Sequence, residues 1–137
     1  MQEYELEELY AVGTEVIQNS RQIYHEMRDI KMWSKEVFVV FCLNARHRII
    51  SREIVTMGTV EASLIHPREI FRTAVLRQAS AVVIAHSHPS GDPNPSEEDN
   101  EVTKVATEAG RVIGIQLVDH VIVGKDRFFS YADRGLI

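Results

Sequence analysis

Cysteine is almost absent from this sequence, because Cys42 is the only one among 137 residues. A single thiol excludes an internal disulfide framework and every zinc ribbon that is built on cysteine ligands. The sequence also has no uninterrupted apolar run of the roughly 18 residues that a membrane-spanning helix needs, and its first residues, MQEYELEELYAVG, are acidic where a signal peptide is basic. These absences predict a cytoplasmic protein with no membrane association.

Positive charge is in the minority, since 15 Lys and Arg residues stand against 20 Asp and Glu residues and give a formal net charge of −5. That balance argues against a protein whose main task is to bind nucleic acid through its phosphates. With 45% apolar residues and no repeat or long linker, the chain has the composition of one ordinary globular domain. Such a domain buries roughly two-thirds of its unfolded surface without a metal staple, so a bound metal would serve chemistry.

Hydrophobic periodicity and turn residues predict a regular order of elements after a lead-in over residues 1–19. An amphipathic helix is expected over residues 20–31, and the apolar run EVFVVFCL predicts an interior strand over 36–43. The remaining elements are expected as follows: a strand over 48–57 that completes a hairpin, a helix that opens at His66-Pro67, a strand over 81–85, a helix from Ser96 to about Gly110, and strands over 113–123 and 127–130. This order predicts an α/β fold in which helices flank a mixed central β-sheet.

The most informative stretch of the sequence reads AHSHP and, after a loop rich in proline, PSEED. His86 and His88 leave an apolar strand at alternate positions, so their side chains project to the same side and can share one cation. Asp99 lies in the first turn of the next helix, and the loop between is long enough to fold back. Two imidazoles and one carboxylate with an open fourth position are the ligand set of a catalytic zinc, which brings a water to a pKa of about 7.

Each part of this pattern also has an ordinary explanation. A His-x-His pair arises by chance, and Ser96-x-x-Asp99 is a capping box in which the two side chains bond to each other's backbone amides. The complete string is more specific, because a polar His-Ser-His at the end of an apolar strand is costly in a core and typical of a site at the carboxyl edge of a sheet. We therefore favour the metal site.

The same residues resemble a known family. His86-Ser87-His88-Pro89, six further residues and then Ser96-x-x-Asp99 match the JAMM motif of the JAB/MPN metalloprotease superfamily without a gap. The stretches HPREIF, LVDHVIVG and FFSYADRG look like the JAB domain of bacterial RadC-like DNA repair proteins, and the resemblance covers residues 20–137. It implies a three-layer sandwich of the type that cytidine deaminases also have.

The resemblance also implies a role for each site residue. His86, His88 and Asp99 would bind Zn²⁺, and a water in the fourth position would attack a peptide or isopeptide amide of a protein or peptide substrate. The superfamily takes its general base from a glutamate that opens the apolar strand after the first helix, and Glu36 holds that place, with Glu53 on the next strand as the rival. Ser96 would offer its hydroxyl to the developing oxyanion.

A second hypothesis from the same resemblance is a DNA-repair-associated or partner-binding module with a non-catalytic metal site. It rests on the family resemblance alone, and it is opposed by the net charge of −5 and by the absence from this sequence of the helix-hairpin-helix region that full-length members carry. Ser87 replaces the asparagine usual in RadC-like proteins and is typical of the deubiquitinating branch.

A zinc deaminase is excluded because its His-x-Glu and its paired cysteines are missing. The other histidines, which are His25, His47, His66 and His120, are interpreted as structural.

Overall fold

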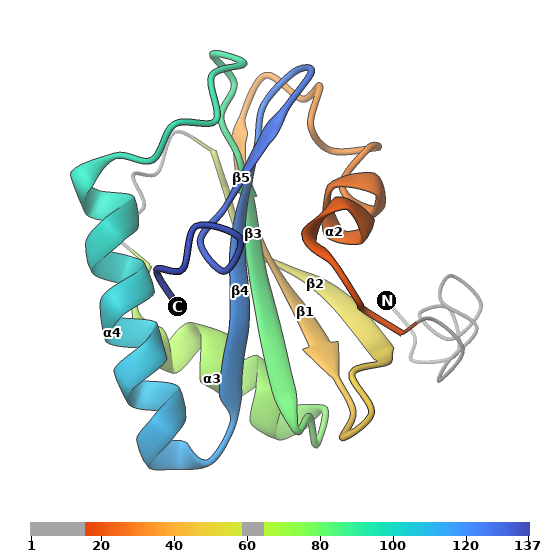
Figure 1. The fold of residues 1–137 in the computed structure, drawn as a ribbon, viewed down its shortest axis with the longest axis vertical. Helices are drawn as coiled ribbons and strands as arrows, with labels where there is room; N and C mark the ends of the chain where they lie inside the picture. Colours follow the sequence, from red (N-terminus) through yellow and green to blue (C-terminus); the bar gives the residue numbers. More distant parts are fainter. Residues whose placement is uncertain (1–15, 59–64) are drawn as a thin grey trace.

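The computed structural model describes residues 16–58 and 65–137, so most of the expected lead-in over 1–19 lies outside the described residues (Figure 1). Its elements follow in this order: α2 (Ser20–Glu26), β1 (Glu36–Leu43), β2 (Ile49–Gly58), α3 (Pro67–Leu76), β3 (Ala81–Ser87), α4 (Glu97–Ile113), β4 (Gln116–Val123) and β5 (Phe128–Ser130). The predicted succession of a helix, a hairpin, two helix–strand pairs and a last strand is confirmed. None of the helices in the described ranges has the length and the apolar character to cross a membrane.

The strands form one five-stranded sheet in the order β2-β1-β3-β4-β5. β1 is antiparallel to both β2 and β3, whereas β3 and β4 are parallel and are joined through α4. A sheet with both kinds of pairing is mixed, as predicted. β1 and β3 are buried along almost their whole length, which explains why their sequences are continuous apolar runs rather than alternating ones.

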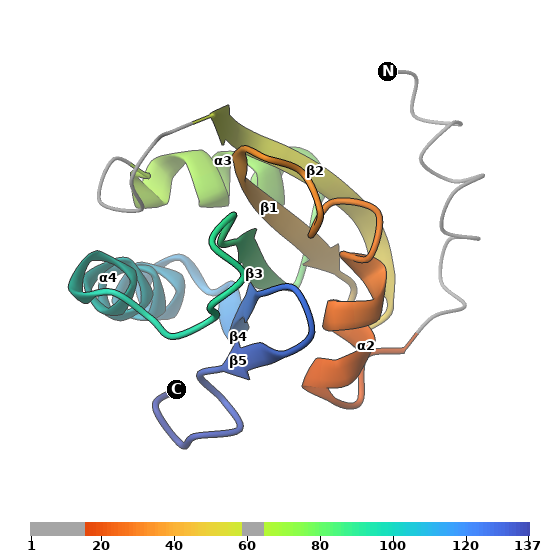
Figure 2. The ribbon, with the colours of Figure 1, turned by 90° about the horizontal axis from the view of Figure 1, so that it is seen from above.

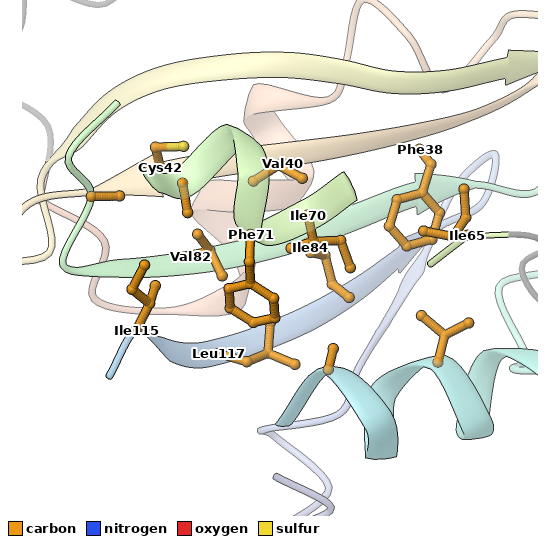
Figure 3. Close-up of a cluster of buried hydrophobic side chains, with 14 residues drawn as sticks. Phe38, Val40, Cys42, Ile65, Ile70, Phe71, Val82, Ile84, Ile115 and Leu117 are labelled. Atoms are coloured by element: carbon orange, nitrogen blue, oxygen red, sulfur yellow. The ribbon is translucent and has the colours of Figure 1, made fainter. Parts of the chain in front are cut away.

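The sheet lies between two layers of helix, with α2 on one face and α3 and α4 on the other (Figure 2). On the α3 and α4 side, Phe38, Val40 and Ile84 from the strands pack with Phe71 and other apolar side chains (Figure 3). On the opposite face, Ile23 and its neighbours near α2 pack against the alternate residues of the same strands. The three-layer α/β sandwich expected from the sequence is confirmed.

The first helix is shorter than predicted, because α2 ends at Glu26 and the chain continues to Lys31 as turns. Arg52 of β2 stabilises the early end. Its guanidinium donates to the carbonyl oxygen of Glu26 at 2.9 Å and also forms a bidentate ion pair with Asp29. The guanidinium thereby caps one of the last carbonyls of the helix, while Met27 and Ile30 remain buried in the core beneath.

The prediction that the helix beginning at Ser96 ends near Gly110 is wrong. α4 continues to Ile113, and Gly114 forms the C-cap in the left-handed conformation at φ 87°. Gly110 has a different role, since a Cβ at this position would lie 2.4 Å from the carbonyl oxygen of Ile115 and 3.2 Å from the Phe71 ring. The glycine permits the chain to return closely past the helix on its way into β4.

Candidate metal centre

The candidate site lies at one edge of the sheet, where β3 ends and both β1 and α4 begin (Figure 1). Because β1 and β3 are antiparallel, with Phe38 opposite His86, the start of β1 lies beside the end of β3. Side chains on alternate strand positions share a face, so Glu36 is on the same side of β1 as Phe38 and Val40, which face α3 and α4. The first turn of α4 therefore approaches the same point from above this face.

His86, His88 and Asp99 are brought together as the sequence predicted. The Nε2 atoms of the two histidines lie 3.0 Å apart. Asp99 reaches both rings at once, with Oδ1 at 3.1 Å from Nε2 of His86 and Oδ2 at 3.3 Å from Nε2 of His88. His86 and Asp99 are buried, whereas His88 is partly exposed, so the cluster opens to solvent on the side of His88.

Glu36 completes the cluster from β1. Its Oε1 lies 3.7 Å from Nε2 of His86, and one ligand atom from each of Glu36, His86 and His88 falls within 4.8 Å of the others, close enough to hold a metal ion. Ser87 aligns the two strands here, since its buried hydroxyl accepts a hydrogen bond from the Val37 amide at 3.1 Å. β1 and β3 are thus joined at the residue next to Glu36.

Glu53, the rival for the role of general base, lies elsewhere on the sheet. It pairs with Val40 in the middle of the hairpin rather than at the edge where Glu36 begins β1. Its carboxylate accepts two hydrogen bonds from the Arg77 guanidinium, each 3.0 Å long. Glu53 therefore serves an ion pair between β2 and the end of α3.

Ser96 is the N-cap of α4 and takes part in a complete capping box. Its hydroxyl oxygen accepts from the Asp99 amide at 3.1 Å, and the Ser96 amide donates to Asp99 Oδ2 at 2.8 Å. The cap uses the oxygen of the hydroxyl and leaves its proton free to be donated elsewhere. Capping and donation to an oxyanion are therefore compatible in one exposed side chain.

A second layer of hydrogen bonds holds the two imidazoles. His88 Nδ1 donates to the backbone carbonyl of Asp92 in the proline-rich loop at 2.8 Å. His86 Nδ1 lies 2.9 Å from Nε2 of His120, a fully buried residue of β4 whose Nδ1 is 2.6 Å from the Thr103 hydroxyl. Metal-binding histidines usually have such an outer partner on the nitrogen that faces away from the ion.

The contact with His120 was missed by the sequence analysis, which interpreted this residue as structural. The available signal was the pair Asp119-His120 inside the apolar run LVDHVIV, because two buried polar side chains in a strand require polar partners. Asp119 has its own partners, since it accepts hydrogen bonds from the His120 amide, the Ser130 hydroxyl and the Ala132 amide. Of the other histidines interpreted as structural, His66 is indeed the N-cap of α3 and His25 is exposed.

The electrostatics of the cluster keep its carboxylate charged. Burial alone would raise the pKa of Asp99, but the hydrogen bonds that it accepts from His86 and His88 when these rings carry a proton on Nε2 outweigh burial and hold that pKa far below the usual range. Burial lowers the pKa of His88, yet Asp99, the Asp92 carbonyl and the charge of Glu36 outweigh it and raise the pKa overall. Burial, assisted by repulsion from His86, holds the pKa of His120 well below its ordinary value, so this ring is neutral.

The donor set fits a zinc ion. Imidazole nitrogens and carboxylate oxygens are ordinary zinc ligands, and three of them with an exposed side match the pattern of a catalytic centre rather than a closed structural one. The arrangement also favours a bound positive charge, since His88 Nε2 and one oxygen of each carboxylate, Glu36 and Asp99, lie within 4 Å of His86 Nε2. Without a cation or a shared proton these lone pairs repel.

Comparison with known proteins agrees with the geometry. The model of the RadC-like JAB domain family matches residues 17–136. A UPF0758 protein of Symbiobacterium thermophilum is 53% identical over 104 residues, which are 76% of this chain and 44% of that protein. Those of Geobacillus thermodenitrificans and Methanosarcina barkeri are 46% and 41% identical over 81% and 84% of this chain and 49% of theirs. The chain spans about half the length of these relatives, and it belongs to the RadC-like JAB domain family.

Proposed function

We propose that this domain is a zinc-dependent hydrolase that cleaves a peptide or isopeptide amide bond with a metal-activated water. The observation that carries the proposal is the convergence of His86, His88 and Asp99 on one point that is open to solvent, with the carboxylate of Glu36 beside it. The wider JAB/MPN superfamily includes metalloproteases, which supports the same reaction class. No role in this proposal depends on nucleic acid.

In this proposal His86, His88 and Asp99 hold the ion and Glu36 does not. Asp99 contacts both imidazoles, is buried and is kept charged, as a permanent ligand should be. Glu36 lies at a longer distance, 3.7 Å from His86 Nε2, and is partly exposed, so it can move a proton to and from solvent-side groups. A zinc ion held there would lower the pKa of a water to about 7 and polarise the substrate carbonyl.

The proton transfers fall to Glu36. As the water oxygen bonds to the amide carbon, the Glu36 carboxylate accepts a proton from that water. It then donates this proton to the amide nitrogen while the carbon–nitrogen bond breaks, so that a carboxylic acid and an amine leave and Glu36 returns to its charged state. During the attack the Ser96 hydroxyl donates to the oxyanion while its oxygen continues to cap α4.

Replacement of Ser96 separates these two roles. Ser96→Ala should lower the free energy of unfolding by about 1 kcal/mol because the cap is lost, and should also slow hydrolysis. Ser96→Gly should cost only a few tenths of a kcal/mol of stability yet slow hydrolysis as much, since glycine is a tolerable cap without a hydroxyl proton. Denaturant unfolding and initial rates measure the two effects. Full activity of Ser96→Gly would exclude the oxyanion role.

The substrate in this proposal is a protein or peptide that carries positive charge near the scissile bond. Glu97, Glu98 and Glu101 are exposed in the first turns of α4, next to Asp99, and make the surroundings of the site negative. Such a surface repels phosphate-rich polymers and attracts basic segments, including the neighbourhood of a lysine in an isopeptide bond.

The test uses zinc-loaded protein and two sets of substrates, which are peptides of mixed sequence and peptides joined through a lysine Nε amide. Mass spectrometry of the products should show new carboxyl and amino ends that disappear after treatment with a chelator and return when zinc is restored. His88→Ala, purified in the same way, should produce none of them. Cleavage that survives both chelation and this substitution would contradict the proposal.

A further inference from the structure

A continuous chain of hydrogen bonds runs from the metal site into the core. It begins at His86 Nδ1, passes through both ring nitrogens of His120 with distances of 2.9 and 2.6 Å, and reaches the Thr103 hydroxyl. That hydroxyl donates to the carbonyl oxygen of Asp99, one turn earlier in α4, at 2.8 Å. All four residues are buried, so water does not compete for these bonds.

The last bond of the chain fixes the direction of all the others. A carbonyl oxygen only accepts, so the single Thr103 proton is used on Asp99, and toward His120 the hydroxyl oxygen must accept. His120 therefore carries its proton on Nδ1. The ring is fully buried and bonds to Thr103 and His86, which carry no negative charge, so a second proton would leave a buried charge uncompensated. Its Nε2 therefore accepts the proton from Nδ1 of His86. His86 is left with a bare Nε2, and this is the atom that faces His88 and Asp99.

His88 reaches the same state by an independent route. Its Nδ1 faces the Asp92 carbonyl at 2.8 Å, which again can only accept, so Nδ1 carries a proton, and in the neutral ring that binds a metal Nε2 is bare. The two imidazoles thus both direct a lone pair, and not a proton, at one point. For His88 a backbone carbonyl supplies the outer partner, whereas for His86 this function requires two side chains from β4 and α4.

We propose that His120 and Thr103 are positioning residues of the metal centre, which fix the tautomer and the ring orientation of His86 so that its Nε2 is always ready to bind the ion. The inference rests on the proposed function in that it assumes a metal at this site. Further packing supports the assignment, since the His86 ring stacks on Phe38 and the His120 ring stacks on Tyr131, whose hydroxyl donates to Asn100. Stacking therefore fixes the plane of each ring, in addition to the hydrogen bonds at its nitrogens.

The first measurement needs no substitution. NMR of the imidazole nitrogens in the zinc-loaded protein reports which nitrogen of each ring carries a proton and which binds the ion. We expect Nδ1–H for both His86 and His120. A proton on Nε2 of His120 would reverse the hydrogen-bond chain and overturn the proposal, and this readout remains decisive even if a variant fails to fold.

The second measurement compares zinc affinity among threonine variants by competition with a chelator. Thr103→Val keeps the shape of the side chain but removes the oxygen that accepts from His120, so zinc affinity should fall by about 10-fold or more, as for other outer partners of metal ligands. Thr103→Ser should bind zinc like the wild type. Thr107→Val is the matched control, because Thr107 makes the same bond to the carbonyl one turn earlier, that of Thr103. Equal affinities of Thr103→Val and Thr107→Val would overturn the proposal.

These outcomes are separable from a failure of the proposed function. If the protein binds zinc but cleaves no amide, the proposed function fails while the affinity comparison still decides the role of Thr103. If wild-type protein binds no zinc at all, both the proposed function and the positioning role fail.

Discussion

His88→Ala should abolish zinc binding in a protein that still folds. Protein purified without added metal should contain close to one zinc per chain, and the variant should contain little by elemental analysis. Loss of an outer partner of a metal ligand already weakens binding by about 10- to 100-fold, so loss of the ligand itself should cost at least about 100-fold. His88 suits this test because it is partly exposed, and its removal leaves both cores intact.

The matched control is His25→Ala, which removes an exposed imidazole from α2 on the opposite face of the sheet. It should retain the zinc content and the chelator resistance of the wild type. Zinc should also raise the midpoint of thermal unfolding in wild type and in His25→Ala but not in His88→Ala, because a ligand stabilises only a state that binds it. Equal zinc content in all three proteins would show that the His86 and His88 pair is not the metal site.

Glu36→Gln should leave zinc bound and remove hydrolysis. An amide side chain has nearly the same shape but cannot accept a proton from water at neutral pH, and a general base contributes about 100- to 10,000-fold to rate. We expect a loss of that size in kcat/KM with zinc affinity within a few-fold of the wild type. The two readouts together distinguish a base from a ligand, since a ligand variant would lose both.

Glu53→Gln provides the comparison, because Glu53 was the alternative base in the sequence analysis. It breaks the ion pair with Arg77, a partly exposed contact, and should cost no more than about 1 kcal/mol of stability with no change in rate. Loss of zinc from Glu36→Gln would instead assign Glu36 as the third ligand in place of Asp99. A slow Glu53→Gln beside a fully active Glu36→Gln would reverse the assignment of the base.

Much of the fold was predictable because the local signals were strong. The run EVFVVFCL gave β1 its bounds, and a proline after His66 and a serine before an acidic turn marked the starts of α3 and α4. Two helix ends were not predictable from local sequence. α2 ends where Arg52, 26 residues further along, takes the Glu26 carbonyl. α4 passes Gly110 because that glycine serves a close contact with Ile115, not a cap.

The residues of the candidate site also differ in how far local sequence predicts them. The sequence places His86 and His88 two positions apart on one strand, so strand geometry alone predicts that they converge, and Asp99 follows within a short loop. The role of Glu36 could be predicted only from the family resemblance, because no local pattern indicates which of several glutamates lies beside β3. The role of His120 depends on the parallel register of β3 and β4, with Ile84 opposite His120, and on a threonine of α4. The polar pair inside the apolar run of β4 indicates that His120 has buried partners but does not indicate which residues they are.

Each strand after the β1–β2 hairpin joins the sheet at the same growing edge, since β3 pairs with β1, β4 with β3 and β5 with β4. Domains generally fold as units. Glu36 comes from the hairpin, the two histidines from β3, Asp99 from α4 and His120 from β4, so the centre takes one residue or pair from each successive addition to this edge. The centre and its buried support are therefore complete only when the chain as far as β4 has joined the sheet.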